Sequence, residues 1–335
     1  DLMKVLFIGS NFGNGHLQFL ALKKMYKNVE KIDPSFVIGK NKLISYIFHK
    51  ISPKILEPII NIYVNRKIKN NYDLIYVKAG EYIGKDLIII LKKKTKKIVY
   101  FCNDNPFVER DKKRWDLFHP ASKFYDLIIF QDKSRISGAK KKGLKKVIIV
   151  TPPYDKNIHK KINLKKKNKD VVFVGTWSKQ KGYFIKRLIE LGLKIKIYGS
   201  NWKKDKNFQS IRKFITTGHL KFMNYTKIIR SSKIAIALYS DENKDTITAR
   251  SLEIPAIGTF MLSKKTPTMT KLFKENKEVV FFKTPEECFK KCNFYIHNSR
   301  KREIIAKNGY NKVRKHLSVS NEDLIKKIIQ ITFNK

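Results

Sequence analysis

The chain has 335 residues, 42% of them hydrophobic, which is enough for two domains with separate cores rather than one. Its 73 basic and 28 acidic residues give a formal net charge of +45, which indicates either an anionic partner or a lysine-rich codon bias on a solvated surface. Three cysteines and no apolar run of membrane-spanning length exclude a disulfide scaffold and a transmembrane protein, so we expect a cytoplasmic protein.

Hydrophobic runs alternate with helical stretches through the first half of the chain. The runs that we interpret as strands cover residues 4–9, 72–77, 97–102, 125–130 and 146–150. Regular alternation of this kind predicts an α/β domain with a doubly wound parallel sheet. Ligands of such sheets bind outside the carboxyl ends of the strands, so the loops at these ends are the first places to look for a site.

Two of these loops carry candidate catalytic residues. The loop after residues 4–9 contains Gly13, Gly15 and His16, and its glycine spacing differs from the dinucleotide fingerprint, which argues against a nicotinamide or flavin enzyme. His16 is a candidate general base, or else a cap or lining residue. Asp104 follows residues 97–102 and is a second candidate base for an acceptor hydroxyl, or else it shapes the turn before Pro106.

Residues 41–70 are apolar, aromatic and basic, with Pro53 and Pro58 breaking the run. They predict two amphipathic helices. Such helices either cover the sheet of the first domain or lie on an anionic bilayer, and the sequence leaves both interpretations open.

The polar, lysine-rich residues 157–169 are the predicted linker between two domains. Beyond them the α/β alternation resumes. We expect an N-terminal domain over residues 1–156 and a second domain over residues 170–318, followed by a C-terminal helix in residues 319–335.

Residues 245–262 predict a cap, a short helix, a break and a buried strand. Asp245 is a suitable N-cap, and Pro255 and Gly258 are expected to end the helix before the strand. One face of such a helix carries four residues, Thr246, Ala249, Arg250 and Glu253. Arg250 and the helix N–H groups suit a phosphate, and Glu253 suits a vicinal diol. Alternatively, Arg250 and Glu253 pair in solvent.

The same stretch resembles the donor-binding segment of GT-B glycosyltransferases, especially the spore-maturation (CgeB-like) group, in its run R-x-x-E-I-P-A-x-G-x-F. The resemblance implies that Glu253 holds the ribose of a nucleotide. Retaining GT-B families carry two glutamates at the spacing of Asp245 and Glu253, and here the first is shortened to aspartate. We therefore count Asp245 among the candidate catalytic residues.

A second segment, residues 173–182, carries the run F-V-G-T-W followed by Lys181 and a glycine, and it resembles the diphosphate-binding loop of the same enzymes. The family's arginine is replaced by Thr176, so the resemblance implies that diphosphate binding relies on Lys181 and Arg250, with Lys179 as an alternative. The remaining positions that the resemblance implies for the donor are Gly175, Thr176, Tyr198, Thr246 and Thr248, while Gly13 and Gly15 belong to the acceptor-side loop.

Together these resemblances imply the GT-B fold: two Rossmann-like domains facing a cleft, with the C-terminal helix packing back on the first. They imply a glycosyltransferase that moves a sugar from a nucleoside-diphosphate sugar to a hydroxyl of a cell-envelope glycan, a lipid-linked glycan or a protein. No Asp-x-Asp dyad is present, so we expect no metal and no cofactor, with retention of configuration preferred over inversion.

The alternatives are a non-enzymatic basic module for nucleic acid or anionic lipid, and a nucleotide-sugar epimerase of the same fold. We do not expect nucleic acid as a partner, but peripheral contact with an anionic membrane, at the inner face of the plasma membrane, is compatible with the charge.

Overall fold

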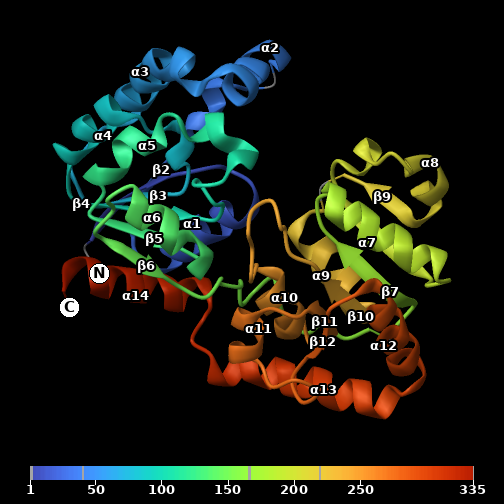
Figure 1. The fold of residues 1–335 in the computed structure, drawn as a ribbon. Helices are drawn as coiled ribbons and strands as arrows, with labels where there is room; N and C mark the ends of the chain where they lie inside the picture. Colours follow the sequence, from blue (N-terminus) through green and yellow to red (C-terminus); the bar gives the residue numbers. More distant parts are fainter. Residues whose placement is uncertain (1–2, 40, 165–166, 219, 335) are drawn as a thin grey trace. The chain divides into compact units, whose positions relative to one another are not determined.

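The computed structural model describes residues 3–39, 41–164, 167–218 and 220–334. These fold into two compact units (Figure 1). The first comprises Asp1–Thr151 together with Asn321–Lys335, and the second comprises Pro152–Ser320. In the described part of the chain, no helix is long and apolar enough to cross a membrane.

The first unit is built on a six-stranded parallel sheet with the order β2-β1-β3-β4-β5-β6. Its strands are β1 (Lys4–Ile8), β2 (Asn28–Ile32), β3 (Tyr72–Val77), β4 (Thr95–Cys102), β5 (Leu127–Phe130) and β6 (Val147–Ile149). β2 is an addition to the predicted strands. Its sequence, NVEKI, buries only Ile32, because it forms an edge of the sheet and its side chains need not be apolar.

Helices cover both faces of this sheet. On one face, α1 (Gly13–Met25) and α14 (Asn321–Phe333) pack together, with Leu22 and Ile328 in one apolar cluster. The other face buries Phe48, Ile60 and Leu87. The helices of this unit other than α1 and α14 are α2 (Lys42–Tyr46), α3 (Glu57–Lys67), α4 (Lys85–Lys92), α5 (Phe118–Ala121) and α6 (Ile136–Lys141). Short helical turns lie at η1 (Pro34–Val37), η2 (Ile47–Ile51), η3 (Pro53–Leu56), η4 (Gly80–Tyr82), η5 (Glu109–Trp115), η6 (Ser122–Phe124) and η7 (Lys133–Arg135).

The second unit repeats the architecture with the strand order β12-β11-β10-β7-β8-β9, again fully parallel. Its strands are β7 (Lys169–Val174), β8 (Ile195–Gly199), β9 (Ile215–Thr217), β10 (Ser232–Ala237), β11 (Phe260–Lys264) and β12 (Val280–Phe282). Its helices are α7 (Lys179–Glu190), α8 (Phe208–Ile211), α9 (Phe222–Arg230), α10 (Arg250–Ile257), α11 (Pro267–Leu272), α12 (Pro285–His297) and α13 (Ser299–Asn311). Short turns lie at η8 (Trp202–Lys204), η9 (Arg212–Phe214) and η10 (Lys312–His316). Two parallel α/β sheets confirm the predicted fold class.

The helix predicted after Asp245 begins later than expected. α10 starts at Arg250, and its N-cap is Ala249, which has no side-chain cap. Asp245 therefore does not cap it. Pro255 lies inside the helix rather than ending it, whereas Gly258 adopts φ +78° and ends the helix as predicted. The prediction failed because the cap residue was chosen from residue type alone, and the intervening residues form a turn instead.

Candidate functional site

The sheet of the second unit has a topological switch point between β7 and β10. These two strands are neighbours, and the chain continues outward from β7 through β8 and β9 on one side and from β10 through β11 and β12 on the other. Open parallel sheets bind ligands outside the carboxyl ends of the strands at such a point. The residues that follow β7, together with α10 after β10, are therefore the candidate donor site.

Close backbone packing fixes the loop after β7. The Gly175 N–H donates to the Tyr198 carbonyl at 2.9 Å, and the Gly175 carbonyl accepts from the Trp202 indole Nε1 at 3.0 Å. A Cβ on Gly199 would lie 2.0 Å from that carbonyl oxygen, so only glycine fits. Trp202 is fully buried and is a packing residue rather than a contact for a nucleotide base. Tyr198 contributes its backbone and is half-buried.

The glycine after Lys181 also has a packing role. A Cβ on Gly182 would lie 2.0 Å from Oδ2 of Asp205, which accepts a 2.7 Å hydrogen bond from Trp177 Nε1. Lys181 itself is partly exposed in the first turn of α7. Thr176 Oγ1 lies 3.2 Å from Ser200 Oγ. The loop and Lys181 thus flank the end of β7.

Arg250 connects α10 to the end of β7. Its Nε donates to the Val174 carbonyl at 2.6 Å, and its guanidinium lies over the Tyr225 ring, 5.6 Å from the centroid. The N–H groups of Ser251 and Leu252 donate to the carbonyls three residues earlier. A phosphate at this point would therefore be held by the Arg250 side chain rather than by these N–H groups, contrary to the expectation from the sequence.

One turn further along α10, Glu253 forms a buried pair with His159. The Glu253 side chain is 4% exposed, and His159 is 3% exposed, with Nε2 3.8 Å from Glu253 Oε1. The His159 ring packs edge-on against Tyr225. The sequence did not identify His159 as a site residue, because it lies within residues 157–169, where lysine-rich composition predicted a linker.

His159 is held in one tautomer. Its Nδ1 accepts a 3.0 Å hydrogen bond from the Asp155 backbone N–H, so the ring proton resides on Nε2 and points towards Glu253. Burial lowers the pKa of His159, and the nearby Arg250 and Arg314 guanidinium groups lower it further, while Glu253 and Asp155 oppose the shift. The protonated Nε2 of a neutral His159 therefore faces the Glu253 carboxylate. Burial and the Glu253 charge also raise the pKa of Tyr225 well above its ordinary value.

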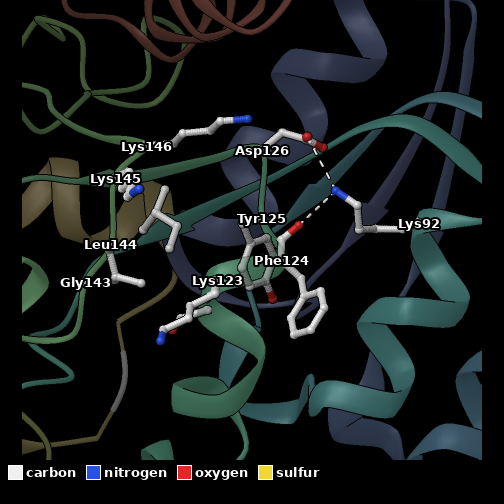
Figure 2. A pocket seen from close by; sticks show the side chains of 11 residues that line it. Lys92, Lys123, Phe124, Tyr125, Asp126, Gly143, Leu144, Lys145 and Lys146 are labelled. Atoms are coloured by element: carbon white, nitrogen blue, oxygen red, sulfur yellow. Dashed lines mark hydrogen bonds and ion pairs between the residues drawn. The ribbon is translucent and has the colours of Figure 1, made fainter.

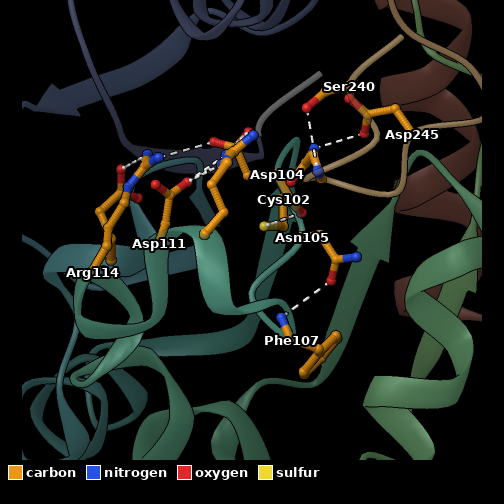
Figure 3. A network of polar contacts seen from close by, with 11 residues as sticks. Cys102, Asp104, Asn105, Phe107, Asp111, Arg114, Ser240 and Asp245 are labelled. Carbon is orange, nitrogen blue, oxygen red and sulfur yellow. Dashed lines mark hydrogen bonds and ion pairs between the residues drawn. The ribbon is translucent and has the colours of Figure 1, made fainter. Parts of the chain in front are cut away.

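The other candidate donor residues lie in the turn before α10. Asp245 Oδ1 accepts from Asn243 Nδ2 at 2.6 Å (Figure 3). Thr246 Oγ1 lies 2.6 Å from Thr268 Oγ1 at the start of α11, and the Thr248 N–H donates to Ser251 Oγ at 3.3 Å. Asp245 and the two threonines stay predictions for the site.

In the first unit, Gly13, Gly15 and His16 form the start of α1, where Gly13 adopts φ +62°. The Lys31 ammonium donates to His16 Nδ1 at 3.4 Å and to the Ser10 carbonyl at 3.0 Å. Burial lowers the pKa of His16, and the Lys31 charge lowers it further. This lysine occupies one ring nitrogen of the candidate base.

Asp104 lies directly beyond the carboxyl end of β4, as predicted, but two arginines hold it. Its Oδ2 accepts from Arg114 Nη1 at 3.0 Å, and its Oδ1 lies 3.4 Å from Arg110 Nη2 (Figure 3). Arg114 also pairs with Glu81 at 2.6 Å. An ion-paired network of this kind favours a positioning role for Asp104 over proton abstraction.

A cavity of about 260 Å³ opens at the carboxyl ends of β1, β3 and β4. Its lining includes Gly15, Lys78, Glu81 and Asn103. The Lys78 ammonium donates to Asn103 Oδ1 at 2.8 Å and lies 4.0 Å from the Phe101 ring centroid. Burial lowers the pKa of Lys78 to about 7, against the opposing effects of Cys102, Glu81 and Asp104. Its position directly after a predicted strand was the only signal in the sequence that could have identified it.

A larger cavity, of about 410 Å³, lies at the opposite end of this sheet, where β5 and β6 begin (Figure 2). There Lys92 Nζ donates to the Phe124 carbonyl at 3.0 Å and lies 3.4 Å from Asp126. Size alone would favour this cavity over the one beside Lys78. The amino ends of parallel strands are not where such sheets bind ligands, so we do not assign it to the site.

Comparison with known proteins agrees with this geometry. Residues 180–323 match the family model described as "Glycosyl transferase-like". Among solved structures, Anabaena HepE in complex with UDP and glucose superposes with a TM-score of 0.67 at 13% identity, covering 99% of this chain and 100% of its own. Sucrose-phosphate synthase from Thermosynechococcus elongatus gives 0.74 at 10% identity, covering 99% and 98%. A glycosyltransferase from Rickettsia africae gives 0.64 at 10% identity, covering 100% and 98%.

No curated protein matches the chain in sequence. The structural neighbours are GT-B glycosyltransferases, and their likeness extends over both units of this chain. The predicted GT-B fold is confirmed, whereas the CgeB-like group is not separately identified. The chain thus has the GT-B fold, and its residues 180–323 match the family model described as glycosyl transferase-like.

Proposed function

We propose that the protein is a metal-independent glycosyltransferase that binds a UDP-sugar donor at the switch point of the second unit. The observation that carries this proposal is the buried Glu253 carboxylate, oriented by His159 and one helical turn from Arg250. A buried carboxylate that a neutral partner orients still needs hydrogen-bond donors. The vicinal hydroxyls of a ribose supply two of them.

Uridine as the base is supported by the neighbours. HepE was solved with UDP, with UDP and glucose, and with UDP-glucose, and an alpha-glucosyltransferase of TM-score 0.66 was solved with UDP-glucose. A shared fold alone does not determine which nucleotide base the donor carries. We therefore take UDP as the first donor to test.

In the proposed mechanism, Arg250 and Lys181 meet the charge that develops on the leaving diphosphate. Preorganised cations aimed at developing charge are among the largest contributions to catalysis. This arrangement needs no metal ion, because the two side chains supply the positive charge. Retention is favoured by the spacing of Asp245 and Glu253 and by the engagement of both candidate bases, His16 with Lys31 and Asp104 with arginines.

The acceptor in this proposal is a hydroxyl of a cell-envelope glycan, a lipid-linked glycan or a protein. It would enter at the first unit, where the cavity beside Gly15 and Lys78 offers polar groups at the strand ends. The CgeB-like subgroup also remains a proposal, carried by the run around Arg250 and Glu253. We further propose that the enzyme works at a membrane surface.

Calorimetric titration with UDP, GDP, dTDP and CDP, in the presence of a chelator, tests the donor site. We expect one nucleotide, UDP, to bind at micromolar concentration without metal and to lose affinity in Glu253→Gln. Glu190→Gln, which changes an exposed glutamate on α7, is the matched control and should bind as the wild type does. If no nucleotide binds, or if both variants bind equally, the assignment of the donor site is wrong.

A further inference from the structure

The segment from η1 to α3 has two apolar faces rather than one. Its inner face buries Phe48, Leu56, Ile60 and Val64 in the core of the first unit. This is the sheet-covering role that the sequence left open. An amphipathic helix of a globular domain would carry mainly polar side chains on its other face, whereas this segment also exposes large apolar side chains there.

The outer face is exposed and apolar. Ile55, Ile59 and Ile62 follow one another at helical spacing, and their side chains are 55%, 55% and 53% exposed. Four further residues of the segment are exposed large hydrophobics: Phe36, Leu43, Tyr46 and Ile51. We call these seven residues the outer apolar face. Figure 1 shows α2 and α3 at the outside of the first unit, away from its sheet.

The concentration of these residues is unusual for this chain. Sixteen large hydrophobics are exposed in the described ranges, and seven of them fall within 27 residues. The other nine are spread along the rest of the sequence. Single exposed hydrophobics are normal on any protein, whereas a group rimmed by polar residues indicates an interaction surface.

Cations surround the outer apolar face. Lys42, Lys50, Lys54, Arg66 and Lys67 are all exposed. The only acidic residue in the sequence from 36 to 69 is Glu57. A Cβ added to Gly84 would lie 1.8 Å from Glu57 Oε1. This carboxylate therefore faces inward, against the start of α4. The outward surface is therefore apolar and positive.

We propose that the outer apolar face docks on an anionic lipid bilayer, with its isoleucines in the acyl boundary and its lysines at the lipid phosphates. Helices with apolar residues on one face and lysine or arginine beside them bind anionic bilayers in this way, by apolar burial and electrostatic attraction together. A second copy of the chain fits less well, because an isologous contact would bring like charges together. This proposal does not depend on the identity of the donor nucleotide.

Vesicle flotation with the full chain tests the proposal. The probe is vesicles of phosphatidylcholine containing about one-third phosphatidylglycerol, compared with phosphatidylcholine alone. We expect binding to the anionic vesicles only. The triple variant Ile55→Ser/Ile59→Ser/Ile62→Ser should bind at least tenfold more weakly, while a triple serine variant of exposed residues elsewhere, Leu20, Tyr183 and Ile304, should bind as the wild type does.

A second pair of variants separates the local charge from the net charge of the whole protein. Lys50→Gln/Lys54→Gln should weaken vesicle binding, and Lys274→Gln/Lys277→Gln, with the same net charge and equally exposed positions, should not. Thermal unfolding of each variant checks that it is folded. Equal loss in both lysine variants, unchanged binding of the isoleucine variant, or no binding by the wild type would overturn the proposal. So would a wild-type dimer in sedimentation that the isoleucine variant abolishes, since the face would then bind a second copy.

Discussion

His159 Nε2 lies 3.8 Å from Glu253 Oε1, and both side chains are buried at the switch point of the second sheet. The histidine comes from the segment before β7 and the glutamate from α10, more than ninety positions apart in the sequence. Because the Asp155 N–H fixes the histidine tautomer, the ring N–H on Nε2 faces the carboxylate. This pair places a buried carboxylate in the candidate donor site.

Glu253→Gln keeps the size of the side chain and removes its charge. We expect the dissociation constant for UDP to rise about tenfold or more, equivalent to about 1.4 kcal/mol, because a hydrogen bond to a charged group is lost. UMP should lose affinity to the same extent, since the ribose is common to both. Calorimetry with the two nucleotides measures this, and a loss confined to UDP would contradict the ribose assignment.

Arg250→Gln should separate phosphate binding from ribose binding. Removing the guanidinium leaves the diphosphate without its cation, so we expect UDP affinity to fall about tenfold and UMP affinity to fall less. Arg187→Gln, at a partly exposed arginine on α7 that pairs with Glu286, is the control. Equal losses for UDP and UMP would indicate that Arg250 acts only by holding the end of β7.

His159 predicts a pH dependence of stability. Burial lowers its pKa below the ordinary 6.5, so in the interval between these values the unfolded chain binds more protons than the folded protein. Above pH 6.5 the protonation of His159 therefore does not reduce the free energy of unfolding. As the pH falls below 6.5, the free energy of unfolding decreases. His159→Asn, whose carbonyl can still accept from Asp155, should lose less stability on acidification.

The difference in melting temperature between wild type and His159→Asn, measured at about pH 8 and about pH 5.5, checks this. Other histidines with lowered pKa, such as His16 and His119, are common to both proteins and cancel in the comparison. If the difference does not change with pH, His159 does not titrate in this way.

The sequence predicted most strands because buried parallel strands are continuous hydrophobic runs that no turn residue interrupts. The two strands it missed, β2 and β9, both lie at sheet edges. β9 is only three residues long, and two of them are exposed. An edge strand can form from a less apolar sequence, and the hydrophobic pattern alone does not reveal such a strand, whereas the apolar edge strand β6 was predicted.

The candidate site residues also differ in whether the sequence could reveal them. Arg250 and Glu253 could be proposed from the sequence because a helix places both on one face and a family motif spans them. His159 could not be found, because its burial arises from packing against α10, and its neighbours in sequence are polar and basic. The start of α10 was misplaced since four candidate first-turn residues precede Arg250, and only tertiary contacts, such as Tyr239 with Ser251, select among them.

Gly199→Ala should destabilise the protein through a steric clash. Gly199 has φ +152°, and a Cβ would lie 2.0 Å from the Gly175 carbonyl oxygen. Gly218 has φ +121° but no atom within 4 Å of the same position, so Gly218→Ala isolates the backbone strain. We expect Gly199→Ala to be less stable than Gly218→Ala by roughly 1–3 kcal/mol, the usual cost of overpacking. Urea unfolding measures both, and equal stabilities would show that the loop can move apart.

Lys78 predicts a pH effect in the alkaline range. Its pKa is about 7 in the folded protein against an ordinary 10.5, because burial disfavours the ammonium. Between these values the unfolded chain binds more protons, so stability rises as the pH increases from about 7 towards 10.5. Lys78→Met removes the buried charge and should therefore be more stable than the wild type near pH 7. The difference in stability between the two proteins should become smaller as the pH rises. Partial exposure of the side chain reduces the size of the effect.

Lys93→Met, at an exposed position after α4, is the control, and its stability difference from the wild type should not change with pH in this way. Melting temperatures at about pH 7 and about pH 9.5 decide the matter, and a gap that stays constant or widens with pH would mean that Lys78 remains a normal, solvated ammonium.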